Sequence, residues 1–148
     1  MRFWRALASH GSIISGVNHL ISGPHASAIA GSENSISSEH AIVVGGNDNV
    51  ALDGAGVVLV TGLNNEASGL RSSVMGGYLS KASGVDSSVS GGAGNKASGV
   101  YSSVSGGLNN KASGKCSSVL GGSDKHVNSS FSFRFRCLRI RGDLMLPL

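Results

Sequence analysis

Residues 67–126 read ASGLRSSVMGGYLSK, ASGVDSSVSGGAGNK, ASGVYSSVSGGLNNK and ASGKCSSVLGGSDKH, which are four copies of one fifteen-residue unit. The same frame continues upstream to residue 6, with one extra residue in segment 36–51. Each unit has a glycine at its eleventh position, namely Gly16, Gly31, Gly46, Gly62, Gly77, Gly92, Gly107 and Gly122. A fixed period of this size indicates a repeat architecture in which each unit stacks on its neighbours. We therefore expect eight coils over residues 6–126.

Small or apolar residues alternate with polar ones twice in each coil, in stretches of the type Asn-x-Ala-x-Gly and Ser-x-Val-x-Gly-Gly. Alternation with a period of two is typical of β-strands, and such short stretches leave no room for a helix. One coil cannot bury an apolar face alone, so successive coils must stack strand over strand at roughly 4.8 Å. The sequence therefore predicts an all-β fold, a parallel β-solenoid (β-roll) with two short strands per coil.

The alternation also predicts which side chains point into the roll. Ala67 should face Val74, and the three following coils repeat this pair. In the earlier coils the two inward positions carry residues of other sizes. The expected inward pairs there are Ile21 with Ala28, Ile36 with Val43, and Leu52 with Leu59. Glycines after each strand are expected to supply the positive φ angles of tight turns. Recurring asparagines before the first strand are expected to satisfy turn backbone groups: Asn34, Asn49, Asn65, Asn95 and Asn110.

The composition argues against several other classes of protein. Aromatic residues make up only 5%, and the 23 glycines are more than twice the usual share, so ordinary globular packing is not expected. Disorder is not expected either, because the mean hydropathy is +0.11 and only 14% of residues are charged. The net charge of +4 comes from the ends, since residues 6–126 hold six basic and seven acidic side chains. We therefore expect no nucleic-acid partner.

The ends of the chain are predicted to be caps, because an open solenoid edge invites aggregation. Residues 1–5 are the expected N-terminal cap, and residues 127–148 are the expected basic and aromatic C-terminal cap. Within the latter, the string FSFRFRCLRIR alternates aromatic with polar residues, which predicts a capping strand with one apolar and one cationic face.

Targeting signals and cysteines add little. We identify no signal peptide, because Arg5 interrupts the first apolar stretch. No apolar run approaches about eighteen residues, so we expect no membrane insertion of this chain. Cys116 and Cys137 do not form a disulfide framework or a zinc site, and a single bridge between them stays open.

The string Asn-x-Ala-x-Gly-x-x-Ser-x-Val-x-Gly-Gly resembles the YadA-like head repeat of trimeric autotransporter adhesins, and the resemblance covers residues 6–126. It implies a left-handed parallel β-roll, a homotrimer, and an extracellular or cell-surface location. The coiled-coil stalk and membrane barrel of those adhesins have no counterpart in this sequence. The alternation of seven- and eight-residue half-coils is also similar to the grass ice recrystallisation inhibition proteins, which implies ice as an alternative ligand.

The outward residues of the second strand form two columns, which we take as the candidate binding face. One column is rich in serine, and the other holds Met75 and Leu120 as well as serines. Both columns turn aliphatic toward the N-terminus, and such a patch suits protein docking. The predicted face consists of Ser73, Ser88, Ser90, Ser103, Ser105, Ser118, Ile42, Val44, Val58 and Val60. The ordinary alternative is that serine merely tolerates a strand surface while the aliphatic residues cover a neighbouring subunit.

Two further columns carry titratable side chains. One holds His10, His25 and His40, which share a place in three consecutive coils and should stack at a turn. Parallel side chains on one edge do not converge on a tetrahedral centre, so we expect no metal site. The other column consists of Lys81, Lys96 and Lys111. It could attract an anionic glycan or sulfate, or its side chains could simply extend into water.

Catalytic patterns are missing from the sequence. No carboxylate pair, Ser/His/Asp arrangement or phosphate loop recurs at a useful spacing, and a thin roll offers no deep pocket. We therefore expect no enzyme and no cofactor. The leading hypothesis is an adhesin-like structural or binding module that presents flat, repetitive faces to a protein, a glycan or another extended surface. The alternatives are an ice-binding roll, disfavoured because Thr61 is the only threonine, and an inactive fragment of a longer surface-display protein.

Overall fold

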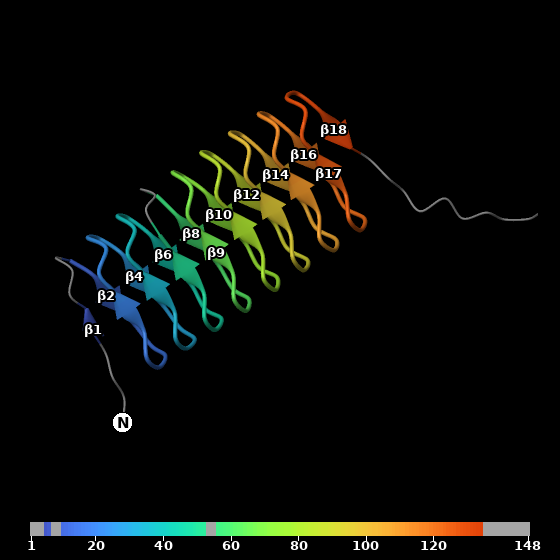
Figure 1. Ribbon diagram of the computed structural model, residues 1–148. Helices are drawn as coiled ribbons and strands as arrows, with labels where there is room; N and C mark the ends of the chain where they lie inside the picture. Colours follow the sequence, from blue (N-terminus) through green and yellow to red (C-terminus); the bar gives the residue numbers. More distant parts are fainter. Residues whose placement is uncertain (1–4, 7–9, 53–55, 135–148) are drawn as a thin grey trace, which may run out of the picture.

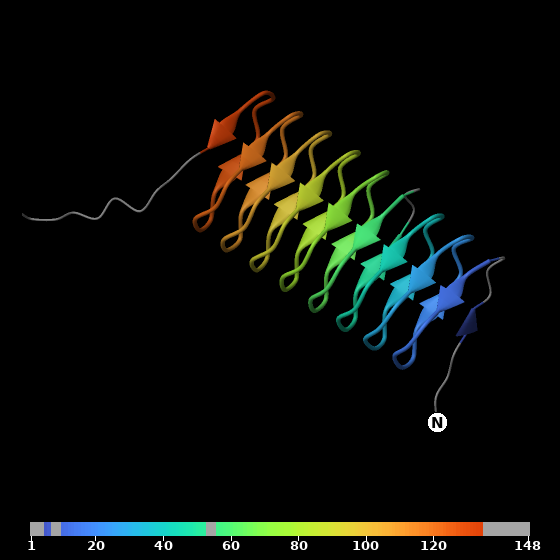
Figure 2. The same cartoon turned by 180° about the vertical axis from the view of Figure 1, so that it is seen from behind.

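The computed structural model describes residues 5, 6, 10–52 and 56–134, which form one stack of coils (Figures 1 and 2). Each coil adds one two-residue strand to each of two nine-stranded sheets. The odd sheet contains β1 (Arg5–Ala6), β3 (Leu20–Ile21), β5 (Ser35–Ile36), β7 (Val50–Ala51), β9 (Glu66–Ala67), β11 (Lys81–Ala82), β13 (Lys96–Ala97), β15 (Lys111–Ala112) and β17 (His126–Val127). The even sheet contains β2 (Ser12–Ile13), β4 (Ser27–Ala28), β6 (Ile42–Val43), β8 (Val58–Leu59), β10 (Ser73–Val74), β12 (Ser88–Val89), β14 (Ser103–Val104), β16 (Ser118–Val119) and β18 (Phe133–Arg134).

All strand pairs are parallel and in register, so equivalent residues of successive coils lie above one another. Val74 pairs with Val89, and Ala82 pairs with Ala97. Backbone hydrogen bonds join each coil to the next; the Ser88 N–H, for example, donates to the Ser102 carbonyl at 3.0 Å. The predicted all-β, parallel β-solenoid of about eight coils is confirmed, and no helix occurs among the described residues. Because strand polar groups find their partners only in neighbouring coils, the stack is the unit of stability.

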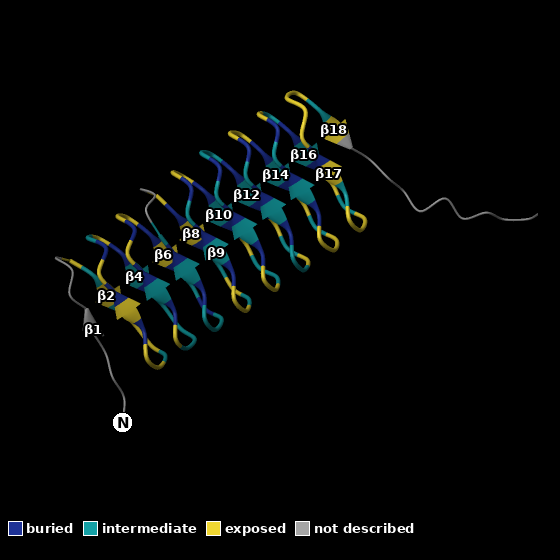
Figure 3. Ribbon diagram, viewed as in Figure 1, coloured by how far each residue is buried: buried dark blue, intermediate teal, exposed yellow. Residues whose placement is uncertain are grey.

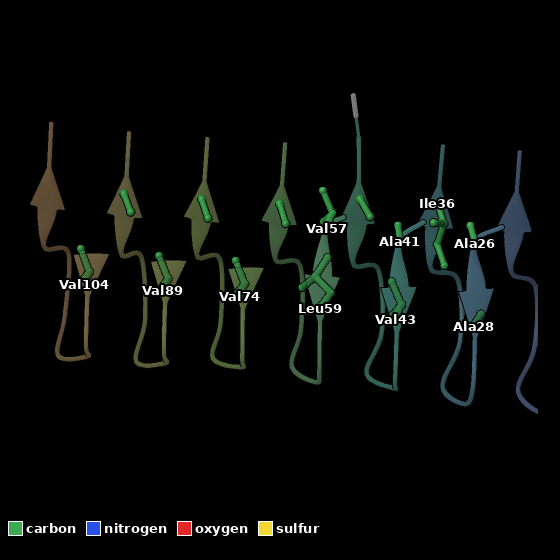
Figure 4. Packing of buried hydrophobic residues seen from close by; sticks show 14 of the residues in the cluster. Ala26, Ala28, Ile36, Ala41, Val43, Val57, Leu59, Val74, Val89 and Val104 are labelled. Atoms are coloured by element: carbon green, nitrogen blue, oxygen red, sulfur yellow. The ribbon is translucent and has the colours of Figure 1, made fainter. Parts of the chain in front are cut away.

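The core is a thin layer between the two sheets, with one inward row from the strands of each sheet and a further buried row just before the even strands, which contains Ala26, Ala41 and Val57 (Figure 4). In the C-terminal coils alanine of the odd sheet faces valine of the even sheet, and both rows are fully buried. The predicted inward positions are confirmed for Ile21 with Ala28 and for Ile36 with Val43, since all four side chains are buried. Colouring by burial shows buried and more exposed positions alternating along the chain (Figure 3).

The expected inward pairing of Leu52 with Leu59 is wrong. Ala51 is the residue in register with Ala67, and it is fully buried, whereas Leu52 is half-buried on the outer side of the odd sheet. The large Leu59 therefore lies opposite a small alanine, as Ile21 lies opposite Ala28. A large inward residue on one sheet still faces a small one on the other, but the residue opposite Leu59 is Ala51 and not Leu52.

The extra residue also lies elsewhere than in segment 36–51. The offset between β5 and β7 is 15 residues, whereas the offset between β6 and β8 is 16. The insertion therefore falls in the turn between β7 and β8. A turn can absorb one residue, but an insertion inside a strand would turn every following side chain to the other face of the sheet.

Glycines at the eleventh position have the positive φ angles predicted for them. At Gly107 φ is +88°, and a Cβ there would meet the Gly122 carbonyl oxygen at 2.1 Å. The glycines after the first strand behave differently, which corrects the expectation of positive φ there. Gly99 does not have a positive φ, but a Cβ would lie 2.1 Å from the Gly114 carbonyl oxygen, and the positive φ of 56° falls on Tyr101 instead. Close approach of the next coil, not backbone freedom, favours glycine at this position, which Ser38 and Ser129 occupy in two other coils.

Positive φ angles also occur at two columns of other residues, one at each turn. The first turn column contains His10, His25, His40, Arg71, Asp86, Tyr101, Cys116 and Phe131. The second contains Asn18, Glu33, Asp48, Asn64, Leu79, Asn109 and Asp124. In this conformation the backbone N–H reaches the preceding coil; that of Asp86, for example, donates to the Leu70 carbonyl at 2.9 Å. These bonds between coils offset the cost of a conformation that most side chains avoid.

The predicted asparagine ladder is confirmed, and we use this name for Asn34, Asn49, Asn65, Asn95 and Asn110. The Oδ1 atom of Asn95 accepts from the Asn110 N–H at 2.9 Å. Its Nδ2 group donates to the carbonyls of Gly91 at 2.7 Å and Gly107 at 3.0 Å. Each buried amide thus satisfies three backbone groups at the corner of the roll, except that of Asn34, which satisfies two, and an apolar residue could satisfy none.

Three other residues occupy the same column. His19 is the first rung, and its Nδ1 accepts from the Asn34 N–H at 3.4 Å. Ser80 interrupts the ladder, because its hydroxyl contacts only the carbonyl of Tyr78, at 3.4 Å. Lys125 ends the described ladder, since its backbone N–H donates to Asn110 but its side chain has no acceptor.

The stack extends past residue 126, so the first part of the predicted C-terminal cap forms a further rung. Val127 is buried in the inward row of the odd sheet, and β18 pairs in parallel with β16. Phe133 is in register with outward Ser118 and is 58% exposed, whereas Arg134 is in register with inward Val119. Residues 1–4 and 135–148, including Cys137, lie outside the described residues.

Candidate functional site

The outer face of the even sheet brings the predicted serines together in two straight columns. The first column follows the strand register and contains Ser73, Ser88, Ser103 and Ser118, all half-buried. The hydroxyls of Ser103 and Ser118 lie 3.0 Å apart and hydrogen-bond to each other. Ser90 and Ser105 lie in the second column and are exposed. Because the strands carry these side chains on a common hydrogen-bonded frame, the face is ordered before any partner arrives.

The N-terminal part of the same face is aliphatic. Ile42 and Val58 are 41% and 37% exposed, and Val44 and Val60 beside them are half-buried. The sequence analysis missed two members of the second column, Ile14 and Ile29, which share the spacing of Val44 and could have been found by it. We define the aliphatic patch as Ile14, Ile29, Ile42, Val44, Val58, Val60 and Met75.

An apolar edge continues the aliphatic patch around the corner of the roll. Leu63, Tyr78 and Leu108 belong to one column of single β-bridges and are 39%, 47% and 48% exposed. Leu79, next to Tyr78, is 53% exposed although its φ is positive. The sequence reasoning did not single out these residues, because the alternation pattern assigns a face only to strand positions and leaves turns undefined.

The outer face of the odd sheet has a different chemistry in its C-terminal half. Lys81, Lys96 and Lys111 are in register on consecutive strands. The Lys81 ammonium lies 2.6 Å from the Glu66 carboxylate. Burial acts to raise the pKa of Glu66, but the hydrogen bonds it accepts and the charges of Lys81 and Lys96 outweigh burial, so this pKa lies below its usual value. The carboxylate is therefore ionised at neutral pH and holds Lys81.

The predicted histidine stack is confirmed at the first turn. The ring centroids of His10 and His25 lie 5.0 Å apart, those of His25 and His40 lie 5.1 Å apart, and the rings are inclined by 7° and 10°. Stacked rings of this kind direct their nitrogens along parallel lines rather than toward one centre. In the described part of the chain no three histidine, cysteine, aspartate or glutamate side chains come together as a metal site.

No protein-family model matches the chain, and no curated protein is similar to it in sequence. Within the described ranges, no helix is long and apolar enough to cross a membrane. The outward columns of the two sheets are therefore the features that indicate a function.

Proposed function

We propose that the chain is a non-enzymatic, adhesin-like binding module whose even-sheet face docks along an extended partner surface. The observation that carries this proposal is the pair of outward columns on the even sheet, which repeat in register on every coil from β4 to β16. Many weak contacts at one fixed spacing add up, because the first contact places the others at high effective concentration. A rigid frame also lowers the entropy lost on binding.

A second copy of the chain is the proposed occupant of the aliphatic patch. The patch exposes Ile14, Ile42, Val58 and Met75, and a neighbouring subunit would remove these side chains from water. The resemblance to the YadA-like heads favours a homotrimer and, with it, a cell-surface location. The serine columns farther along the even sheet would then stay available for a protein, a glycan or another extended surface.

Molar mass in solution, measured by light scattering, tests this assignment. We expect about three times the 14.9 kDa of one chain. The double variant Ile42→Ser and Val58→Ser should dissociate, because serine already occupies the same column at Ser73 and Ser88 and is compatible with the fold. The matched control, Ser88→Ala, should keep the parent mass. A parent chain that is monomeric at every concentration would contradict the assignment.

Ice binding is the competing function, and a monomer would make it the leading one. It requires a regular hydroxyl lattice, but Ser103 and Ser118 already bond to each other. An ice recrystallisation assay at micromolar protein separates the two functions. Inhibition of crystal growth that is lost in a Ser90→Leu and Ser105→Leu variant would favour ice over the adhesin-like function.

A further inference from the structure

The C-terminal half of the odd sheet carries an unusual row of like charges. We call Lys81, Lys96 and Lys111 the lysine column, and the next strand has His126 in register with Lys111. Parallel pairing in register separates successive side-chain origins by roughly 4.8 Å. In water, two unit charges so close repel each other by about 1 kcal/mol at low salt. The column therefore holds positive charge where the same column in earlier coils carries Ser35 and Val50.

Acidic side chains do not neutralise the column beyond its first member. Glu66 pairs with Lys81, and no carboxylate within the described ranges forms an ion pair with Lys96 or Lys111. The other two acidic residues of the C-terminal coils have partners at the turns. Asp86 accepts two hydrogen bonds from Arg71, at 2.7 and 2.6 Å.

Asp124 accepts a hydrogen bond from the Ser123 hydroxyl at 2.5 Å. This carboxylate is at the second turn, and the pKa of Asp124 is lowered chiefly by hydrogen bonds from Ser123 and Asn109. Asp86 and Asp124 thus accept hydrogen bonds from residues at the turns and form no ion pair with the lysine column. Lys96 and Lys111 consequently form no ion pair of their own, although the charge of Glu66, which is held by Lys81, also reaches Lys96.

A row of hydroxyls lies beside the lysine column on the same face. Ser83, Ser98 and Ser113 stand two residues after the three lysines, so the alternation of the strand places them on the outer side as well. All three are half-buried. The Ser113 hydroxyl is shielded from solvent and has no hydrogen-bond partner. Each coil of this region therefore places one cation beside one serine, and the lysine ammonium groups, not the shielded Ser113 hydroxyl, are what the face offers to a ligand.

We propose that the lysine column and the serines beside it bind a linear sulfated or carboxylated polysaccharide that runs along the rod. Such a polymer repeats an anionic group and several hydroxyls from sugar to sugar, and the face repeats a cation and a hydroxyl from coil to coil. Lysine suits this partner because its ammonium acts as a flexible point charge that tolerates varied sulfate geometry. Several lysine–anion contacts in a row bind more tightly than separate ones, because the first contact holds the next anionic group close to the next lysine.

A polysaccharide fits this face better than a nucleic acid does. Single-stranded nucleic acids are usually held by aromatic side chains on which bases stack. The exposed tyrosines Tyr78 and Tyr101 lie in turns, and the outward columns of β9 to β15 contain no aromatic residue. The column also contains no arginine, the residue that most often makes paired contacts with phosphates and bases.

The proposal gives a partner class to the binding-module function but uses the sheet opposite the aliphatic patch. The two can therefore fail separately. If Ile42→Ser and Val58→Ser abolish self-association while polysaccharide binding is kept, the two faces act independently. If the parent chain is monomeric and still binds the polysaccharide through the lysine column, only the even-sheet proposal fails.

Binding of the full chain to heparin, used as a sulfated polysaccharide probe, tests the inference. The column variant Lys96→Ser and Lys111→Ser should weaken binding by about tenfold at low salt, since two contacts of somewhat under 1 kcal/mol each are lost. Serine is compatible with the fold there, because Ser35 occupies the same column. The control variant Lys115→Ser and Lys125→Ser removes the same charge near the turns and should change affinity less than twofold.

Three results would overturn the proposal. One is heparin binding that is unchanged in the column variant with an unaltered thermal midpoint. Another is an equal loss in the column and control variants, which would show that net charge or the basic tail accounts for binding. The third is binding of single-stranded DNA of equal charge that is as tight as that of heparin and equally sensitive to the column variant, which would make the partner a nucleic acid.

Discussion

The coils before residue 66 and the coils after it have the same backbone but different side chains. In both halves the strands pair in parallel at one register, and the same corner carries the asparagine ladder. The N-terminal coils place large residues such as Ile36 and Leu59 inside and the aliphatic patch outside. The C-terminal coils repeat alanine against valine inside, and serine and lysine outside.

The features that the two halves share form the roll, and the side chains that differ between them are variable additions to it. Backbone hydrogen bonds, side-chain amides and the eleventh-position glycine are common to both halves, and they define the coil geometry. Apolar burial is larger per coil in the N-terminal half, whereas the C-terminal half buries hydroxyls such as that of Ser102 at the position of Ala41. We therefore expect substitutions at shared positions to have the largest effects, and substitutions at variable positions to have smaller effects of either sign.

Gly107→Ala should cause the largest loss. Its φ is +88°, and the added Cβ would lie 2.1 Å from the Gly122 carbonyl oxygen. Strain and the clash together should lower the free energy of unfolding by about 4 kcal/mol. Gly106→Ala is the matched control, because nothing lies within 4 Å of its added Cβ. Urea titration of both variants measures the difference, and equal midpoints would refute the role assigned to the eleventh-position glycine.

Leu59→Ala should destabilise the roll by about 3 kcal/mol, because it leaves a cavity opposite Ala51 in the N-terminal core. Val104→Ala removes less volume from the uniform half and should cost about 2 kcal/mol. Both residues are fully buried, so exposure does not confound the comparison. If Val104→Ala costs more than Leu59→Ala in thermal and urea unfolding, the N-terminal half does not depend more strongly on apolar packing.

Ser80→Asn should repair the gap in the asparagine ladder and stabilise the roll by about 1 kcal/mol. The new Oδ1 would accept from the Asn95 N–H, as Asn65 accepts from Ser80 now. The backbone is similar at the two places, because Gly77 has a φ of +104° and Gly62, beside which the Asn65 amide lies, has a φ of +113°. The reverse change, Asn95→Ser, should destabilise by a similar or larger amount. A loss of stability in Ser80→Asn would show that the ladder is not a general stabilising device.

Ser102→Ala should raise stability slightly, by up to about 1 kcal/mol, because the buried Ser102 hydroxyl has no hydrogen-bond partner. The variant gives the C-terminal half the residue type that Ala41 supplies in the N-terminal half. Ser72→Ala is the informative counterpart, since the Ser72 hydroxyl accepts from the Gly69 N–H at 3.1 Å, and its loss should be neutral or unfavourable. A drop in thermal midpoint for Ser102→Ala would indicate an unseen partner for that hydroxyl.

The smallest expected effect concerns pH and the first rung of the ladder. Burial lowers the pKa of His19 below the unfolded value of about 6.5. The unfolded chain then binds more protons as the pH falls through 6.5, so the stability that is present above this pH declines on acidification. The urea midpoint of the parent should fall between pH 7.5 and 5.5 by more than that of His19→Asn. Equal shifts in both proteins would exclude His19 as the cause.

The period of the sequence predicted the fold and both inward rows because strand alternation follows from the covalent geometry of the chain. The same period predicted the histidine stack and the asparagine ladder, since a residue repeated at one place must lie above its copy. It did not predict the pairing of Ala51, because a single inserted residue shifts the frame within one turn. It also left Leu63, Tyr78 and Leu79 unassigned, because turns have no fixed inward side.

The sequence by itself therefore determined the architecture, the strand positions and the outward columns of both sheets. Only the tertiary structure decided which glycines are needed for φ and which for clearance, because clearance depends on the carbonyls of the coil above. It also decided that the aliphatic patch continues into the edge at Tyr78, and that Glu66 forms an ion pair with Lys81 while Lys96 and Lys111 form none. These outcomes depend on distances between coils, which local spacing along the chain does not contain.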